Sequence, residues 1–134
     1  MMDVSGAVME ASAPLASVER PIDLVHLARM TFGDRSLEHE VLQLFDRQAT
    51  LLIERMRAVN GAGASPVIGA LAHTLKGSAA GIGAAQVARI AAEAERVAAD
   101  PAGDTPGELS ATIDRLALAV DEARALIAEL LRQG

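Results

Sequence analysis

Apolar residues return every three or four positions through most of the chain after Pro21, which is the spacing that places them on one face of a helix. The pattern predicts five helices, separated by segments rich in glycine, proline and serine. Their expected ranges are about 23–31, 36–59, 66–80, 84–99 and 106 to the C-terminus. Residues 1–20 carry no such period, and we expect them to form a flexible tail.

Four long helices joined by short loops favour an all-α fold. We expect residues 21–134 to form one domain, an antiparallel up-down-up-down four-helix bundle with the short N-terminal helix packed across one end. The apolar faces of four long helices can be buried within one chain, so the protein is expected to be a monomer.

Local capping signals predict where three of the helices begin. Asp23 is placed to cap the first helix, and Ser65 to cap the third, with Pro66 in the first turn where proline is tolerated. Thr105 and Glu108 have the spacing of a capping box at the start of the last helix. Each signal supplies a partner for backbone N–H groups that the helix itself leaves without one.

Composition excludes several classes of function. The chain has no cysteine, which excludes disulfides and cysteine metal sites. Its net charge of −6 and its two aromatic residues argue against binding nucleic acid. No apolar run approaches the roughly 18 residues that span a bilayer. We therefore expect a cytoplasmic protein with no metal, no membrane segment and no nucleic-acid partner.

One histidine in the third helix faces away from the predicted core. At about 100° per residue, Leu75 and Ile82 point inward and His73 points to the opposite side. Lys76 and Gly77 follow it at three and four positions, which makes them its neighbours on the helix surface. A glycine inside a helix costs up to about 1 kcal/mol relative to alanine. A close approach by another protein would explain that cost; otherwise Gly77 is a weak point in a helix that carries an ordinary surface histidine.

Apart from Lys76, the other residues around His73 are small, and together with Lys76 they define the expected partner-binding surface. Its members are Gly69, Ala70, Lys76, Gly77 and Ala80.

The run from His73 to Ser78, followed by Gly81 to Ala84, resembles the signature of histidine-containing phosphotransfer (HPt) domains. These small helical bundles carry phosphoryl groups between response-regulator receiver domains. The resemblance implies that His73 is the phosphoacceptor and that Lys76 stabilises the phosphoryl charge, unless Lys76 is only solvated or pairs with a carboxylate. The other two histidines, His26 and His39, lack this motif.

The same resemblance implies a phosphocarrier that is not an enzyme on its own and needs no cofactor. Its expected partners are the receiver domains of a hybrid histidine kinase and of a downstream regulator, and the receiver would bring the Mg²⁺.

A carboxylate on the next helix is a candidate for orienting the histidine. If the chain turns near Ala84, mirroring His73 about that residue lands on Glu95. HPt domains that resemble this chain often carry Glu or Gln at the matching position, bonded to Nδ1 of the histidine. The alternative is that Glu95 is a solvated charge beside Arg96.

Two other functions remain open. A dimeric phosphotransferase derived from a histidine kinase usually has an acidic residue directly after the histidine, whereas this chain has Thr74. A bundle that binds receivers without turnover, or that is purely structural, would not need His73, Lys76 and Gly77 together.

Overall fold

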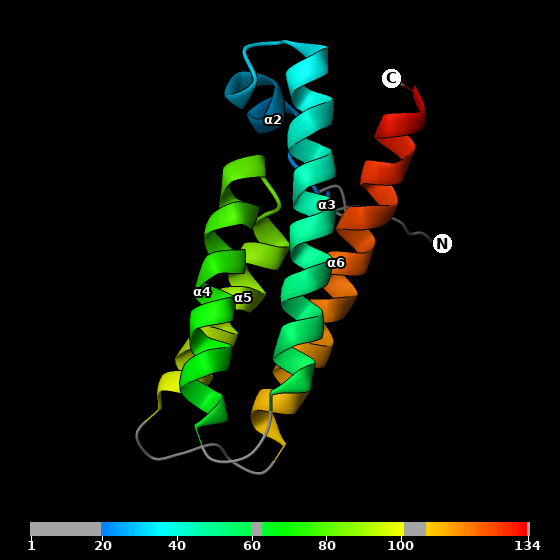
Figure 1. Cartoon of the computed structure of the whole chain (residues 1–134). Coiled ribbons are helices and arrows are strands. Elements are labelled where there is room, and N and C mark those ends of the chain that lie inside the picture. The colour runs from blue at the N-terminus through cyan, green and yellow to red at the C-terminus, as the bar shows by residue number, and fades with distance from the viewer. Residues whose placement is uncertain (1–19, 60–62, 101–106, 134) are drawn as a thin grey trace, which may run out of the picture.

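The computed structural model describes residues 20–59, 63–100 and 107–133, and within these ranges it contains helices and turns but no strand. The predicted all-α class is therefore confirmed. The helices, labelled in Figure 1, are α2 (Leu24–Met30), α3 (Arg35–Ala58), α4 (Ala64–Ile82), α5 (Ala85–Ala99) and α6 (Glu108–Gln133). The predicted tail and the capping role of Thr105 lie outside the described residues. None of the described helices has the length and apolar character needed to cross a membrane.

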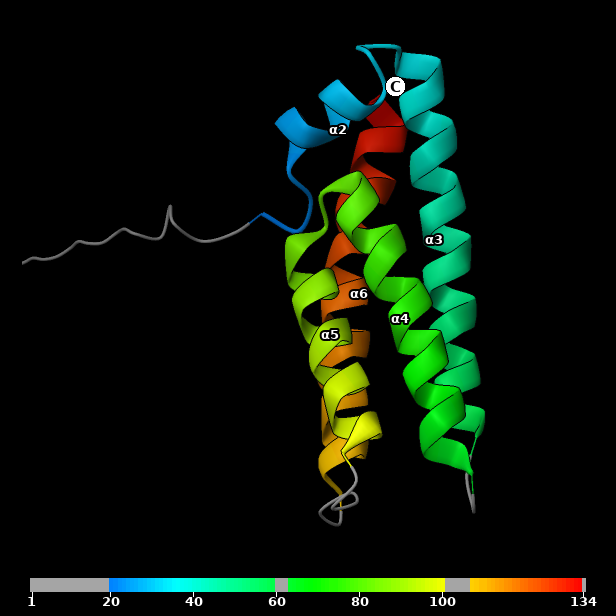
Figure 2. The same cartoon turned by 90° about the vertical axis from the view of Figure 1, so that its left-hand side faces the viewer.

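The four long helices lie side by side, and α2 lies at one end of them (Figures 1 and 2). Two ion pairs tie α3 to α6: Arg57 Nη2 lies 2.9 Å from Asp114 Oδ1, and Arg124 Nε lies 2.6 Å from Asp46 Oδ1. The later residue of α6 pairs with the earlier residue of α3, so these two helices run in opposite directions. The side chains of both pairs are partly exposed, and the pairs show which residues of α3 and α6 lie opposite each other.

The inward faces of all five helices form one core of leucine, isoleucine, valine and alanine. Fully buried side chains include Leu42 and Met56 of α3, Leu75 of α4, Val87 of α5 and Leu116 of α6. Burying apolar surface stabilises the fold by roughly 25 cal/mol per Å² removed from water. Alanines at several core positions allow the helices to approach closely, and α4 and α5 form the most extensive contact between any two of the described helices.

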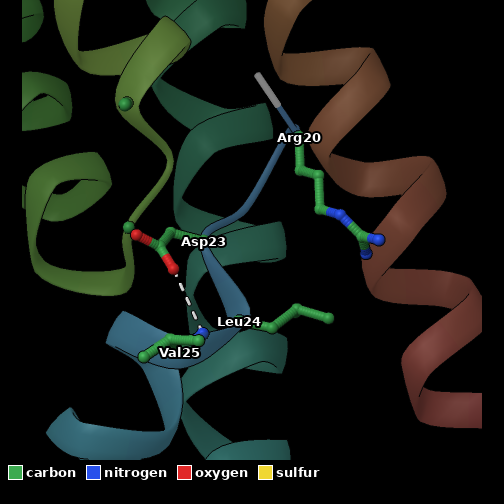
Figure 3. Close-up of a pocket in the computed structure, with 6 residues that line it drawn as sticks. Arg20, Asp23, Leu24 and Val25 are labelled. Carbon is green, nitrogen blue, oxygen red and sulfur yellow. Dashed lines mark hydrogen bonds between the residues drawn. The ribbon is translucent and has the colours of Figure 1, made fainter. Parts of the chain in front are cut away.

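The position of α2 is fixed by its contacts with the turn between α4 and α5. The Asp23 carboxylate accepts hydrogen bonds from the backbone N–H groups of Val25 and His26, both at 3.1 Å, as predicted for a cap. Figure 3 shows the bond with Val25. The backbone N–H of Asp23 donates to the Gly83 carbonyl at 2.9 Å. His26 Nε2 lies 3.1 Å from the Gly81 carbonyl oxygen. These bonds anchor α2 to the end of the helix that carries His73.

The predicted cap of α4 is wrong. The helix begins at Ala64, one residue before Ser65, and no side chain of a described residue accepts a capping hydrogen bond at its N-terminus. Gly63 occupies the cap position with φ = 83°, a left-handed conformation that glycine adopts without steric cost. Ser65 therefore lies inside the first turn of α4, two residues after the cap position.

The break predicted over Gly81–Gly83 is shorter than expected. Gly81 and Ile82 remain helical, and only Gly83 leaves the helix, with φ = 83°. A Cβ at Gly83 would lie 3.1 Å from the Asp23 carbonyl oxygen and 3.2 Å from His26 Cδ2, so the site requires glycine for space as well as for conformation. The backbone N–H of Ala84 donates to the Ala79 carbonyl at 2.8 Å, which closes the end of α4 in the manner of a Schellman motif.

Candidate functional site

His73 lies near the middle of α4 on its outward face. Ala72 and Leu75, on the inward face of the same helix, are buried, whereas the imidazole side chain of His73 is 65% exposed. The ring is nevertheless held, because its Nδ1 lies 2.8 Å from Glu95 Oε2 on α5. Gly83 and Ala84 are the only residues between the two helices, so positions mirrored about them are brought together. The structure thus places the predicted pair in direct contact.

Glu95 bridges two groups of α4. While Oε2 contacts His73, Oε1 lies 2.7 Å from the Lys76 Nζ. The hydrogen bond from Lys76 is the main reason that the pKa of the Glu95 carboxyl is lowered below its ordinary value of 4.5. Partial burial acts in the opposite direction, and the hydrogen bond with His73 adds to the lowering. Glu95 is therefore ionised at neutral pH.

The ionised carboxylate determines which nitrogen of His73 carries the proton. A carboxylate only accepts hydrogen bonds, so the Nδ1 of His73 must be the donor. In the neutral ring, Nε2 then has no proton, and its lone pair is available. This nitrogen lies on the side of the ring away from Glu95, so the arrangement orients a nucleophile toward the outside of the molecule.

Lys76 is paired in this structure. Its ammonium group contacts Glu95, which was the alternative that the sequence left open, and its side chain is 37% exposed. The sequence-based prediction that Lys76 stabilises a phosphoryl group is compatible with this position but is not tested by it. What the contact does establish is that a cation and an imidazole share one carboxylate.

The glycines near His73 have different surroundings. A Cβ built on Gly69 would lie 3.4 Å from Ala98 Cβ, so this glycine allows α4 and α5 to pack closely. A Cβ at Gly77 or Gly81 would meet nothing within 4 Å. Packing among the described residues therefore does not explain Gly77, whereas it accounts for much of Gly69.

The remaining members of the predicted partner surface are Ala70 and Ala80, and both are exposed. A shallow hollow beside His73 is lined by small residues together with the histidine and its carboxylate partner, and they include Pro66, Gly69, Ala70, His73 and Glu95. The five predicted surface residues thus lie on the outward side of α4 or at its edge with α5.

Two contacts between helices of the bundle have no signal in the sequence. Ser78 Oγ donates to Gln48 Oε1 at 2.9 Å, which ties α4 to α3. On the far side of α5, Arg115 donates from Nη1 and Nη2 to the two oxygens of Glu93 at 2.8 and 3.1 Å. The partners are 30 and 22 positions apart in the chain, so only the packing of the helices brings them together.

The other histidines are placed differently. His26 is part-buried and bonds to the end of α4, and His39 lies in the second turn of α3 without the surroundings of His73. Within the ranges that the structure describes, no group of three or more His, Asp or Glu side chains could hold a metal ion.

Comparison with known families gives one match. A family model described as Hpt domain matches residues 40–132, which include α4, α5, most of α3 and nearly all of α6. Comparisons with curated proteins and with solved structures give no match.

Proposed function

Because the chain belongs to the Hpt domain family, we propose that His73 accepts a phosphoryl group from the aspartate of one receiver domain and passes it to the aspartate of another. Members of this family are phosphocarriers that act in two-component signalling, where they interact with response-regulator receiver domains. The observation that carries the proposal for this chain is the contact of 2.8 Å between His73 Nδ1 and Glu95. It leaves Nε2 as the nucleophile on an exposed face.

The transfer follows from the protonation state of the ring. The Nε2 lone pair attacks the phosphorus of the aspartyl phosphate, the bond between phosphorus and the carboxylate oxygen breaks, and the aspartate leaves as a carboxylate. Nδ1 keeps its proton, so the imidazole becomes positively charged as the N–P bond forms. The negative charge of Glu95 faces that developing charge and stabilises it. The second transfer is the reverse of this step, toward a different aspartate.

The Lys76 ammonium supplies positive charge on the same face. It is held by Glu95 in the unphosphorylated protein, within one helical turn of His73. When His73 carries the phosphoryl group, its oxygens compete with Glu95 for that ammonium. A charge-assisted hydrogen bond from Lys76 would then stabilise the phosphohistidine.

The wider setting belongs to the same proposal. The donor is the receiver of a hybrid histidine kinase, the acceptor is the receiver of a downstream regulator, and the receivers supply the Mg²⁺. The protein works in the cytoplasm as a monomer, and its four long helices follow an up-down-up-down order. Support for that order comes from the contacts that pair early residues of one helix with late residues of its neighbour.

A transfer assay with three variants tests the proposal. A receiver labelled on its aspartate is mixed with wild type, His73→Gln and the matched control His39→Gln, and acid-labile phosphate on this chain is counted. Wild type and His39→Gln should take up label equally, and His73→Gln should take up none. Labelling of His73→Gln at the wild-type level would overturn the assignment, and failure of all receivers to label the wild type would favour a bundle without turnover.

A further inference from the structure

The outward side of α3 carries two leucines that the core does not use. Leu44 is 58% exposed and Leu51 is 46% exposed. They are seven positions apart, so they lie within about 20° of each other around the helix. Gln48 lies between them, on the same side, and bonds to Ser78 of α4. The two leucines therefore border the groove between α3 and α4 and do not face α6.

Leu51 lies close in height to His73, and Leu44 lies about two helical turns from Leu51 toward the start of α3. Figure 1 shows that α3 and α4 run in opposite directions, and the bond between Gln48 and Ser78 fixes their register. His73 comes five positions before Ser78, so it is level with position 53 of α3. That level lies between Leu51 and Arg55. A partner that covers the outward face of α4 at His73 and extends past α4 on this side meets α3 at these residues.

The geometry of the imidazole decides from which side the partner comes. Nδ1 is tied to Glu95 on α5, so Nε2 points away from α5. A phosphoryl group can therefore reach Nε2 over the outward face of α4, on the side that is turned away from α5. The small residues of α4 offer no obstacle there, since a Cβ at Gly77 or Gly81 would meet nothing within 4 Å.

Two arginines flank the leucines. Arg47 comes four positions before Leu51 and Arg55 four positions after it, which makes both of them neighbours of Leu51 on the helix surface. Among the described residues, neither guanidinium forms an ion pair, although the chain as a whole has a net charge of −6. A receiver presents a phosphorylated aspartate, and its negative charge is complementary to these cations.

We propose that Leu44, Arg47, Leu51 and Arg55 form a ridge on α3 that docks the receiver domain. The inference rests on the proposed function, because it takes the phosphoryl transfer at His73 as given. It adds a second helix to the predicted surface on α4. The leucines supply apolar surface that is buried on docking. The arginines raise the rate of association and orient the receiver by charge.

The experiment compares the ridge with an exposed leucine elsewhere on the surface. Leu44→Asp/Leu51→Asp is tested beside Leu118→Asp, which changes a leucine that is 62% exposed on α6 and borders α5. Transfer from a phosphorylated receiver should lose about tenfold or more in kcat/KM in the ridge variant, the loss expected from an interface residue of high importance. The Leu118→Asp control should transfer within about twofold of wild type.

A small phosphodonor separates this inference from the proposed function. Phosphoramidate needs no docking surface, so it should label His73 equally in wild type, in the ridge variant and in the control. If the ridge variant takes phosphoryl from the receiver as fast as wild type, the ridge is wrong and the role of His73 stands. If phosphoramidate and the receiver both fail to label the wild type, the proposed function fails, and the inference with it.

A second pair of substitutions keeps the test independent of the leucines. Arg47→Gln/Arg55→Gln retains long polar side chains and should weaken the dependence of the transfer rate on ionic strength, because two of the cations that steer the receiver are gone. An unchanged slope with salt would count against the electrostatic part of the ridge. A slope that becomes shallower, together with slower transfer at low salt, would support it.

Discussion

Two glutamates of α5, two positions apart, face different neighbours. Glu95 gives one oxygen to His73 and the other to Lys76, on the α4 side. Glu93 gives both oxygens to Arg115, on the α6 side. The pKa of each carboxyl is lowered, chiefly by the hydrogen bond from Lys76 for Glu95 and from Arg115 for Glu93. By charge and distance alone, the two sites look alike.

The partner makes the difference. A guanidinium has only donors and stays protonated, so the pair of Glu93 and Arg115 can hold two helices but cannot accept a group. An imidazole that donates from one nitrogen keeps a lone pair on the other, so the contact of Glu95 with His73 leaves Nε2 able to accept a group. A paired carboxylate is therefore weak evidence of function until its partner is known to have a second reactive atom that faces solvent.

The largest effect on the rate of phosphoryl transfer is expected from a substitution that covers the outward face of α4, at the site of Glu95 and His73. Gly77→Gln should slow transfer from a receiver by about 100-fold, because a displaced phosphodonor loses the in-line geometry. Its helix should remain intact, since glycine is among the poorest helix formers and a Cβ at Gly77 meets nothing within 4 Å. Stopped-flow transfer and circular dichroism measure the two effects. Wild-type transfer in this variant would remove the steric explanation for Gly77.

Removing the orienting carboxylate should have the next largest effect. Glu95→Ala is expected to slow transfer by roughly 10- to 100-fold through loss of ring orientation. Glu95→Gln keeps an acceptor for the Nδ1 proton, so it should retain most of the rate. Quench-flow assays with one labelled receiver compare the variants. Equal rates in Glu95→Ala and wild type would show that His73 needs no orienting partner.

The pKa of Glu95 provides a smaller and more specific test. Its pKa is lowered mainly by Lys76, so the contact contributes fully above the ordinary value of 4.5 and is lost as the pH falls through the lowered value. In Lys76→Met the pKa of Glu95 should rise back toward its ordinary value. A titration of the Glu95 side-chain carbon by NMR measures this. An unchanged pKa would mean that the ammonium does not bond to the carboxylate in solution.

The smallest effect is expected at the other glutamate. Glu93→Ala removes a pair whose side chains are 34% and 54% exposed, and such pairs contribute little to stability. The melting temperature should fall by at most about 3 °C, and transfer should stay at the wild-type rate. Thermal denaturation and the same transfer assay test both statements. Slower transfer in this variant would show that the tilt of α5, and not only Glu95, sets the site.

The sequence predicted the elements of the fold because the helical period is a local property. The spacing of apolar residues gave the helices, and Asp23 was predicted correctly as the cap of α2. The cap of α4 was missed because Gly63 adopts a left-handed conformation that shares no signature with a side-chain cap. The break at the end of α4 was overestimated, since Gly81 is compatible with a helix and only Gly83 must leave it.

The pairing of His73 with Glu95 could be predicted from the sequence because only a short turn separates their helices. Two positions mirrored about such a turn are adjacent whatever the rest of the bundle does. The contacts of Gln48 with Ser78 and of Glu93 with Arg115 were out of reach, because they depend on how distant helices pack. Leu44 and Leu51 lie outside the apolar stripe of α3, but their position beside α4 depends on packing between helices and does not follow from the period.

The position of the phosphoryl group on the imidazole tests the account most directly. Wild-type protein with ¹⁵N-labelled histidine is phosphorylated by a receiver, and the nitrogen bonded to phosphorus is identified by NMR through its coupling to ³¹P. The account predicts one phosphohistidine, at Nε2 of His73, with the Nδ1 proton still donated to Glu95. A phosphoryl group on Nδ1 of His73, or on His26 or His39, would contradict it.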